Sequence, residues 1–294
     1  MYEDFCRIEE TVVSWQELQG KAHGFGYDYD PGSPHLSHLR LKKRLGAEIW
    51  SAVDRSFIRK GNCRVLEIGG GHGTITELAV AAGASVTVTE MSEASAVELR
   101  KRFAHNDRVR VIHDRLGDEI LKPESTFDVV LCVSVLHHIP DYLGYVKSLV
   151  DLISPDGDLI TFQDPMWYPR RSRRNMAMYW ACYFAWRAFQ GNLLRGLGTR
   201  IRHVRGIRDQ RLESDMVEYH VVRQGVDEVA LASLVEKQFT STAVVPYWST
   251  QSGVLQRLGE RLSLHSSFAL VATGRGGTTV RPSAGESLRS AQRC

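Results

Sequence analysis

The sequence predicts an α/β fold: a doubly wound, Rossmann-like sheet of seven strands, mostly parallel with the last strand antiparallel, carrying an inserted helical lid. Three observations lead to this prediction. Short apolar runs alternate with helical patterns through residues 61–164, which indicates parallel strands joined by helices. A glycine-rich turn follows the first strand, at residues 69–73. Acidic side chains and a histidine follow the strands where they end, and such sheets bind ligands at the carboxyl ends of their strands.

Length and composition describe an ordinary globular protein. The chain has 294 residues, of which 43% are hydrophobic and 24% charged, enough for one large domain or one domain with an embedded subdomain. No apolar run reaches about 18 residues, so no membrane-spanning helix is expected. The five cysteines are scattered without a C-x-x-C pair, which favours reduced thiols over zinc or redox chemistry. With no signal-peptide pattern at the N-terminus, we expect a cytoplasmic protein, and the net charge of +3 does not suggest a nucleic-acid partner.

The glycine turn stands between a strand and a helix. Val65–Ile68 is an apolar run broken only by Glu67, and Thr74–Ala82 reads as a helix with Thr74 as its cap. Such a turn brings a ligand close to bare backbone, with N–H groups and the positive end of a helix facing it. Glu67 is costly to bury unless it has a partner. A cationic ligand would be one.

The spacing Glu67-x-Gly69-x-Gly71-x-Gly73 resembles the first motif of class I S-adenosylmethionine (SAM)-dependent methyltransferases. A second stretch, Val135-Leu-His-His-Ile-Pro-Asp, is similar to one that recurs in the small-molecule and quinone-type members of that class. The specific motifs cover roughly residues 60–165. The resemblance implies SAM as the cofactor; NAD is disfavoured because an acid inside the glycine motif suits a cationic amino acid moiety better than a pyrophosphate.

Two further strand ends complete the predicted cofactor site. Ser85–Thr89 is β-branched and ends at Glu90, where a carboxylate accepts both ribose hydroxyls in nucleotide-binding sheets. The resemblance implies that Met91 packs on the adenine. A polar helix over 92–105 leads to a third strand, Val109–His113, after which Asp114 is implied to bond the adenine amino group, with Asp118 as the fallback. Arg115 and Ser134 complete the predicted cofactor-binding set.

The fourth and fifth predicted strands end next to the residues that we expect to take part in the reaction. Phe127–Ser134 is a near-continuous apolar run, as expected for a strand covered on both faces. A helix over 142–152 and a turn over 154–158 follow, and then a strand over 159–163 that ends at Asp164. For a hydroxyl acceptor a general base is useful, and histidine is the usual one at neutral pH.

The predicted catalytic residues are therefore His137 and His138, with His137 favoured, and Asp141 could orient its partner. A histidine pair also occurs here in relatives that methylate carbon, where it need not be a base, so that alternative stays open. Metal-dependent members of the class use carboxylates at both of these strand ends. Here the fourth strand ends in Ser134 and only Asp164 is suitably placed, so we predict no catalytic metal.

Residues 165–211 do not belong to a minimal sheet of this kind. Between 165 and 208 they hold ten arginines and no acidic residue. The aromatic run over 175–190 predicts a helix that is apolar nearly all round and hence largely buried. Three interpretations stay open: a substrate lid whose arginines hold an anionic group, a subunit interface, or an interfacial membrane anchor. Membrane contact is not the favoured one.

The predicted organisation has five parts: an N-terminal cap over the active site (1–60), the SAM-binding core (61–164), the basic aromatic lid insert (165–211), the rest of the core sheet (212–273) and a disordered tail (274–294). The fourth part should hold a helix capped by Asp227 and two strands, over 242–247 and 267–273, paired antiparallel. The predicted substrate-binding residues are Tyr27, His35, Asp164, Trp167, Tyr168, Tyr219 and His220.

The function these features favour is a SAM-dependent O-methyltransferase acting on a hydroxyl of a small molecule or saccharide, with a histidine base and a homodimeric assembly. One alternative is a C-methyltransferase on a prenylated or lipid-like substrate, with the insert touching a membrane. Another is a non-catalytic SAM- or NAD-binding protein.

Overall fold

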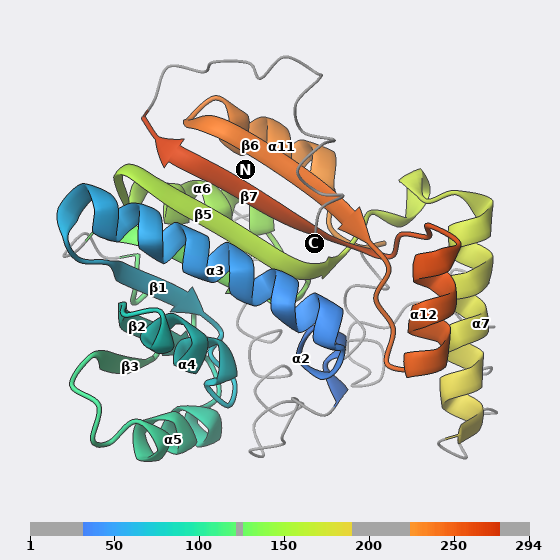
Figure 1. The fold of residues 1–294 in the computed structure, drawn as a ribbon, viewed down its shortest axis with the longest axis horizontal. Helices are drawn as coiled ribbons and strands as arrows, with labels where there is room; N and C mark the ends of the chain where they lie inside the picture. The colour runs from blue at the N-terminus through green and yellow to red at the C-terminus, as the bar shows by residue number, and fades with distance from the viewer. Residues whose placement is uncertain (1–31, 122–125, 190–223, 277–294) are drawn as a thin grey trace, which may run out of the picture.

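A computed structural model describes residues 32–121, 126–189 and 224–276. A single seven-stranded sheet runs through these residues in the order β3-β2-β1-β4-β5-β7-β6 (Figure 1). Its strands are β1 (Arg64–Ile68), β2 (Ser85–Glu90), β3 (Val109–His113), β4 (Phe127–Val133), β5 (Ile153–Pro165), β6 (Phe239–Tyr247) and β7 (Ser267–Arg275). The predictions for Tyr27, Tyr219, His220 and the tail beyond residue 276 lie outside the described residues.

The strand directions confirm the predicted fold class. β1 to β5 pair in parallel, while β7 is antiparallel to both β5 and β6. All seven residues of β4 are buried, which fits a central strand covered on both faces. The sheet thus directs the carboxyl ends of β1 to β5 to one edge.

Helices cover both faces of the sheet. They are α2 (Pro34–Ser37), α3 (Leu39–Lys60), α4 (Thr74–Ala81), α5 (Glu93–Arg102), α6 (Tyr142–Asp151), α7 (Arg173–Phe189), α11 (Glu228–Glu236) and α12 (Gly253–Arg261), with short 3-10 turns η2 (Leu136–His138) and η3 (Tyr168–Arg170). Side chains of α3, α4 and α5 share one buried cluster with the sheet. Those of α6 and α11 share the cluster on the other face. Alternate residues of β1 point into the two clusters, Val65 into the first and Leu66 into the second.

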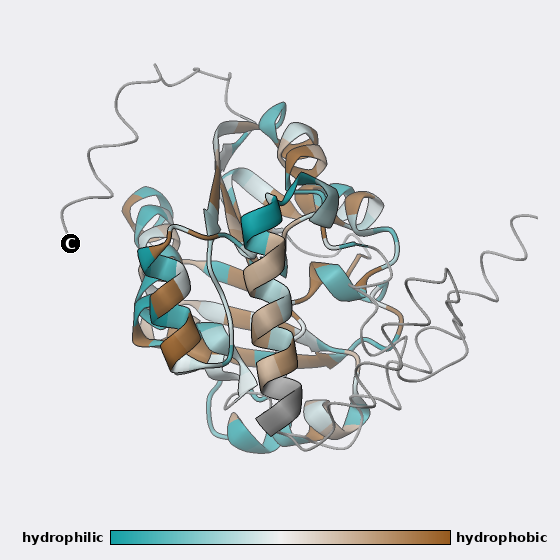
Figure 2. Ribbon diagram, turned by 90° about the vertical axis from the view of Figure 1, so that its right-hand side faces the viewer, coloured by the Kyte–Doolittle hydropathy of each residue, from teal (hydrophilic) through white to brown (hydrophobic). Residues whose placement is uncertain are grey.

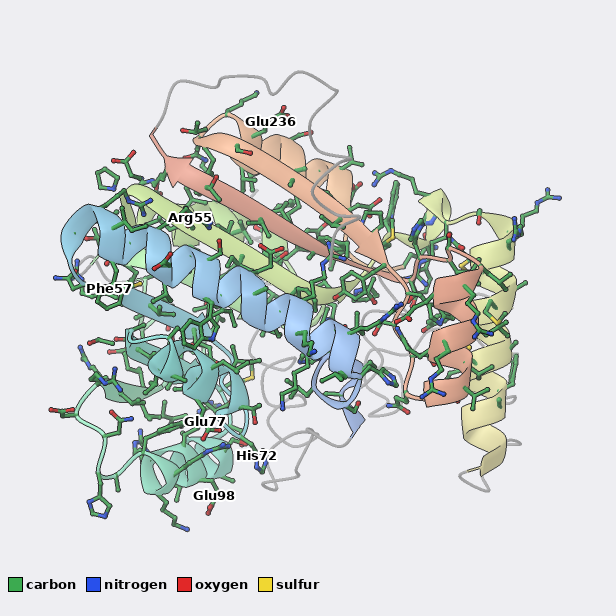
Figure 3. The ribbon with its side chains drawn as sticks, viewed as in Figure 1. Arg55, Phe57, His72, Glu77, Glu98 and Glu236 are labelled. Carbon is green, nitrogen blue, oxygen red and sulfur yellow. The ribbon has the colours of Figure 1, made fainter. Side chains whose placement is uncertain are left out.

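Helix α3 is bound to the sheet at the amino ends of its strands. Arg55 on α3 donates from Nη2 to the Asp158 Oδ2 on β5 at 2.8 Å, and Lys60 donates from Nζ to the Asp128 Oδ1 on β4 at 2.6 Å. Figure 3 labels Arg55 and, two residues further along the same helix, Phe57. This end of the sheet is therefore closed by ion pairs.

Three local predictions differ from the structure. The residues predicted as a turn, 154–158, belong to β5, where they form an irregularity: Ile153 and Asp158 pair with β4, the four residues between them do not, and Asp156 among these has a φ of 61°. The N-cap of α4 is Gly73 rather than Thr74. The helix predicted over 175–190 is present as α7, but most of its described side chains are partly exposed, and only Cys182 among residues 173–185 is buried.

α7 and α12 stand beside each other at one side of the molecule (Figure 1). Cys182 of α7 packs against Trp248 and Leu264, with Leu255 of α12 alongside. Figure 2 faces this side, with α7 in front and the first turn of that helix in the hydrophilic colour. Among the described residues, none of the helices has both the length and the apolar character needed to cross a bilayer.

Candidate active site

A cavity of about 850 Å³ opens at the carboxyl ends of β1, β2 and β4. The glycine turn, the residues after β2 and β3 and the segment after β4 line it. It brings together most of the residues predicted from the sequence: His35, Glu67, Gly69, Gly71, Glu90, Met91, Asp114, Ser134, His138 and Asp141. Those predicted residues that are described but lie outside the lining are Gly73, Arg115, His137, Asp164, Trp167 and Tyr168.

The three motif glycines all adopt positive φ angles, 72° at Gly69, 52° at Gly71 and 86° at Gly73, a region that glycine enters without a steric penalty. A Cβ on Gly71 would meet no atom within 4 Å, so this backbone faces open space. A Cβ on Gly73 would come within 2.6 Å of the Phe103 ring. Gly71 thus leaves the cavity accessible to a ligand, whereas Gly73 allows the turn to pack on α5.

Gly70, which the motif reading passed over, is the most crowded glycine of the turn. A Cβ there would lie 2.2 Å from a methyl carbon of Val88 on β2. Its N–H and that of Gly69 both donate to the Thr89 carbonyl, each at 3.0 Å. These contacts hold the turn against β2. The sequence did contain a signal for Gly70, because four of the five residues over 69–73 are glycine.

Glu67 is a buried acid that has no cationic partner among the described residues. Its side chain belongs to a residue that is 2% exposed, and among the described residues the hydrogen bond to its carboxylate comes from the Thr76 hydroxyl at 2.5 Å. Burial, only partly offset by Thr76 and reinforced by Glu90, raises the pKa of Glu67 to about 8. An ammonium group in the cavity would reverse that shift. The residue therefore fits the cationic amino acid end of SAM.

Glu90 joins the glycine turn to the end of β2. Its Oε2 accepts from the Gly71 N–H at 2.8 Å and its Oε1 from the Ser92 N–H at 2.9 Å. Burial raises its pKa despite these hydrogen bonds. A carboxylate has further lone pairs to offer, so Glu90 can accept hydroxyl groups as predicted while it holds the turn.

The Asp114 carboxylate also has a structural role, which the sequence did not indicate: it accepts hydrogen bonds from backbone N–H groups. Its Oδ1 accepts from the N–H groups of Gly117 and Glu119, at 2.8 and 3.2 Å, and its Oδ2 from that of Ile120 at 3.1 Å. Asp114 thereby folds the loop that forms one wall of the cavity. An adenine amino group would have to share these oxygens. Arg115, next to it, is exposed.

The ends of β4 and β5 are both kinked. Ser134 has φ 59° and Gln163 has φ 70°, an uncommon conformation for residues with a side chain and one that clusters at functional sites. Ser134 lines the cavity, and its N–H donates to the Phe162 carbonyl at 2.7 Å. The two kinks flank the histidine segment.

His137 and Asp164 form a buried pair between these kinks. His137 Nδ1 lies 2.8 Å from Asp164 Oδ1, and the same oxygen accepts the His137 backbone N–H at 3.1 Å. His137 is 8% exposed and Asp164 fully buried. Asp164 Oδ2 accepts no hydrogen bond from the described residues. An aspartate on Nδ1 fixes the imidazole with its Nε2 as the acceptor atom, the form that a general base needs.

Two more histidines adjoin this pair. The His138 ring centroid is 4.0 Å from that of His137, and His138 lines the cavity. His35 of α2 also lines the cavity and is 5% exposed. Burial, with the nearby His137, lowers the pKa of His35 to about 4. His35 is therefore neutral at physiological pH and can both donate and accept hydrogen bonds.

Other predicted residues have local partners. Asp141 is the N-cap of α6, and its Oδ1 accepts from the Gly144 N–H at 2.9 Å, so the acid against His137 is Asp164 rather than Asp141. The Trp167 N–H donates to Glu228 at 3.1 Å, and the Tyr168 hydroxyl lies 3.1 Å from that of Tyr179. Trp167 is thus held by its backbone against α11, and Tyr168 contacts α7.

Sequence reasoning missed two side chains of the site. Thr76, in the first turn of α4, is the hydrogen-bond partner of Glu67. Tyr145 of α6 lines the cavity, and burial raises its pKa. The helical spacing from Asp141, which caps α6, to Tyr145 puts both residues on one side of α6. Thr76 has no comparable signal, because its partner lies nine residues earlier across the turn.

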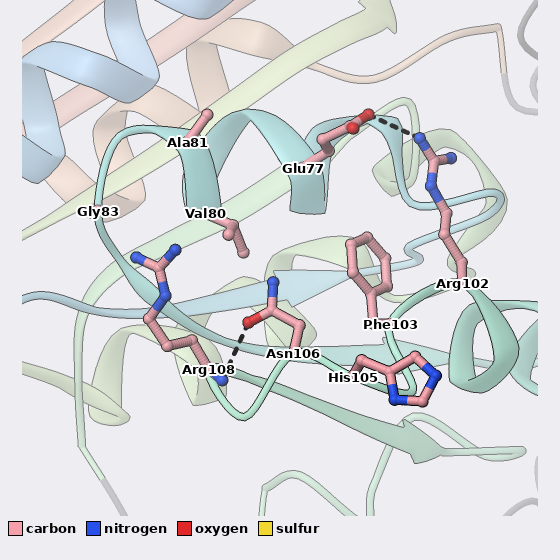
Figure 4. Close-up of a pocket in the computed structure, with 9 residues that line it drawn as sticks. All are labelled: Glu77, Val80, Ala81, Gly83, Arg102, Phe103, His105, Asn106 and Arg108. Carbon is pink, nitrogen blue, oxygen red and sulfur yellow. Dashed lines mark hydrogen bonds and ion pairs between the residues drawn. The ribbon is translucent and has the colours of Figure 1, made fainter.

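A second cavity, of about 510 Å³, lies between α4 and the end of α5 (Figure 4). Its main charged pair, Glu77 and Arg102, is joined at 2.6 Å and is largely exposed. None of the predicted site residues lines it. It is a surface hollow whose polar groups bond to each other, so the larger cavity is the candidate active site.

Across the described ranges, no three His, Cys, Asp or Glu side chains are grouped to hold a metal ion. The absence of a catalytic metal stays a prediction.

Comparison with known proteins places the motif region in a family. Residues 66–159 match the family model described as a methyltransferase domain. Over 143 residues the chain is 34% identical to the mitochondrial ubiquinone biosynthesis O-methyltransferase of Schizosaccharomyces pombe, covering 46% of this chain and 48% of that protein. It is 30% identical over 153 residues to the ubiquinone biosynthesis O-methyltransferase of Vibrio parahaemolyticus, covering 51% and 57%.

The chain spans about half the length of the curated relatives it matches. Among solved structures, the N-methyltransferase NodS from Bradyrhizobium japonicum, in complex with S-adenosyl-L-homocysteine, covers 89% of this chain and 98% of its own, with a TM-score of 0.48 and 13% identity.

Proposed function

We propose that this chain, which contains a class I SAM-dependent methyltransferase domain at residues 66–159, is an O-methyltransferase that methylates a hydroxyl group of a small molecule or saccharide. The observation that carries the proposal is the buried His137–Asp164 pair, 2.8 Å apart, beside the cavity at the carboxyl edge of the sheet. The two relatives named above are O-methyltransferases, which supports the choice of oxygen.

The residues of the cavity fit the cofactor in three places. Glu67 offers a buried carboxylate to the amino group, and its raised pKa is the sign of a missing cation. Gly71 leaves bare backbone facing the ligand. Glu90 stands at the end of β2, where it can accept ribose hydroxyls. When bound, SAM supplies an already activated methyl group.

The chain's own part in the reaction is to orient the acceptor and remove its proton. Asp164 accepts the Nδ1 hydrogen of His137 and so orients the imidazole. In this proposal Nε2 is the ring nitrogen that takes the proton of the acceptor hydroxyl as the oxygen attacks. The imidazolium so formed is stabilised by the Asp164 carboxylate. His35 and His138, which line the cavity next to the pair, are placed to hydrogen-bond the acceptor.

The arginine-rich segment is proposed as the lid that selects the acceptor, with Trp167 and Tyr168 at its base. Residues 190–211 of this segment and residues 1–31 of the N-terminal cap lie outside the described residues, as do Tyr27, Tyr219 and His220. A homodimer and a cytoplasmic location also stay predictions, which size-exclusion chromatography and cell fractionation would test.

The proposal is tested by a methyl-transfer assay over a panel of hydroxylated acceptors, followed by His137→Ala on the best one. We expect turnover to fall by about 10²–10⁴-fold, with the affinity for S-adenosylhomocysteine kept. His105→Ala, at the exposed second hollow, is the matched control and should leave turnover unchanged.

Two results would contradict the proposal. Unchanged turnover in His137→Ala would remove the histidine base. A product methylated on carbon or nitrogen rather than as a methyl ether would replace O-methylation by one of the alternatives.

A further inference from the structure

Helix α12 carries an apolar stripe on its outer surface that the methyl-transfer site does not use. Val254, Leu258 and Leu262 follow one another at intervals of four residues and are 76%, 41% and 42% exposed. Residues at this spacing lie on one side of a helix. The stripe is therefore continuous rather than a set of scattered apolar residues.

The opposite side of α12 is firmly packed. A Cβ on Gly259 would meet the Trp248 ring at 2.2 Å, so the helix lies directly on that ring. Trp248 Nε1 donates to the Leu255 carbonyl at 3.2 Å, and Gln256, which is 3% exposed, donates from Nε2 to the Trp248 carbonyl at 2.8 Å. The orientation of the helix is thus set by its inner face, and the stripe is left outside the core.

Two arginines flank the stripe. Arg257 and Arg261 each stand three residues after a stripe position and are exposed. The one acidic residue of the helix, Glu260, is partly exposed and its carboxylate is engaged by Gln256 and Arg40. The outer face of α12 is therefore apolar along its centre, with two arginines at its margin.

The neighbouring helix adds positive charge on the same side of the molecule. α7 packs against α12 through Leu255, and its first turn begins with the exposed Arg173 and Arg174 (Figures 1 and 2). Four arginines of α7 and α12 are thus presented by one pair of helices.

We propose that the outer face of α12 binds the surface of a membrane that contains anionic lipids, with the stripe in the headgroup–acyl boundary and the arginines on the phosphates. A helix with an apolar face and a cationic margin has this property generally. A second copy of the chain is a poorer partner, because a two-fold interface on this face would bring the same arginines together. The inference is independent of the proposed acceptor and of the reaction.

The test is flotation of the full chain with vesicles of equimolar phosphatidylglycerol and phosphatidylcholine, against vesicles of phosphatidylcholine alone. We expect flotation with the anionic vesicles only. Arg257→Gln with Arg261→Gln should weaken binding about 30-fold, since each arginine near an anionic surface contributes about fivefold. Leu258→Ser with Leu262→Ser should weaken it at low and high salt alike.

A matched control removes the same charge elsewhere. Arg108→Gln, just before β3, with Arg110→Gln on β3 should float like the unaltered chain; both arginines are exposed. Binding of S-adenosylhomocysteine, measured on every variant, shows that each is folded.

No flotation with anionic vesicles, or equal loss in the β3 control, would overturn the proposal. So would a concentration-dependent dimer that both α12 variants abolish, or saturable binding of an acidic protein through the stripe without any binding to vesicles.

Discussion

Two acids of the same sheet, each 2% exposed, show opposite behaviour. Asp128, at the amino end of β4, has a lowered pKa: burial by itself would raise it, but Lys60, the Arg64 N–H and Ser154 outweigh that effect. Glu67, at the carboxyl end of β1, has its pKa raised to about 8 by burial, because Thr76 offsets only part of the cost. Among the described residues, Asp128 at the amino edge is balanced by a cation and two further donors, whereas Glu67 at the carboxyl edge is offset only by the Thr76 hydroxyl.

The difference separates structural acids from functional ones. A buried carboxylate with a cation and two further donors contributes to folding, and removing the cation leaves a costly charge. A buried carboxylate with a single hydroxyl partner is kept at a cost to the empty protein, which a cationic ligand offsets on binding. Mutations at the two edges should therefore affect different measurements.

The largest expected effect lies at the amino edge. Lys60→Met removes the cation from Asp128, and we expect the free energy of unfolding at pH 7 to fall by about 3 kcal/mol, measured by urea denaturation. The folded pKa of Asp128 is depressed, so its contribution is present above the unfolded value and is lost as the pH falls through the folded one. In acid, the free energy of unfolding of the unaltered chain should therefore fall by this contribution. The free energy of unfolding of the Lys60→Met variant should change less over the same pH range.

The control for Lys60→Met is Lys101→Met, which breaks an exposed pair with Glu98 and should cost well under about 1 kcal/mol. Equal losses in both variants would contradict the role given to the Asp128 pair.

At the carboxyl edge the affected quantity is affinity. Glu67→Gln should weaken the binding of S-adenosylhomocysteine about 10–100-fold, the range for a hydrogen bond to a charged group. Stability at pH 7 should rise, because Glu67, whose folded pKa is about 8, must take up a proton on folding at that pH and Gln need not. Isothermal titration and urea denaturation measure the two effects. Asp128→Asn is the opposite case, with lower stability and unchanged affinity. The comparison fails if both variants lower the stability or if both weaken the binding.

The smallest effect concerns Asp141. Because its carboxylate caps α6, Asp141→Ala should cost about 1 kcal/mol of stability and leave turnover unchanged at saturating substrate. A large fall in turnover, with the stability kept, would restore Asp141 to the catalytic role that its sequence position suggested.

The predictions that the structure confirmed rest on local patterns. The central strands are apolar runs, and the positive φ angles of Gly69, Gly71 and Gly73 are what a turn between strand and helix requires. Helix α12 was not predicted, because its apolar residues lie on its exposed side and it is short. The run over 154–158 looked like a turn because Pro155, Asp156 and Gly157 favour turns. It lies within β5 at a register shift, where Ile153 and Asp158 pair with β4 and the four residues between them do not.

Contacts between distant residues escaped the sequence reasoning. The sequence pattern predicted that His137 and Asp164 follow neighbouring strands, but it did not predict that the two side chains form a pair. The contact between His137 Nδ1 and Asp164 Oδ1 depends on how β4 and β5 bend at Ser134 and Gln163. Asp114 was read as a ligand contact, and its three backbone hydrogen bonds arise from a loop of irregular conformation.

The most direct measurement is calorimetric titration of S-adenosylhomocysteine into the full chain, in two buffers of different ionisation enthalpy below pH 8. A cationic amino group on Glu67 would ionise a carboxyl that is protonated in the empty protein, so we predict binding with release of a proton and an affinity that rises as the pH approaches 8. Both features should vanish in Glu67→Gln. No binding, or binding without proton release in the unaltered chain, would contradict the account of this cavity as a cofactor site completed by a cation.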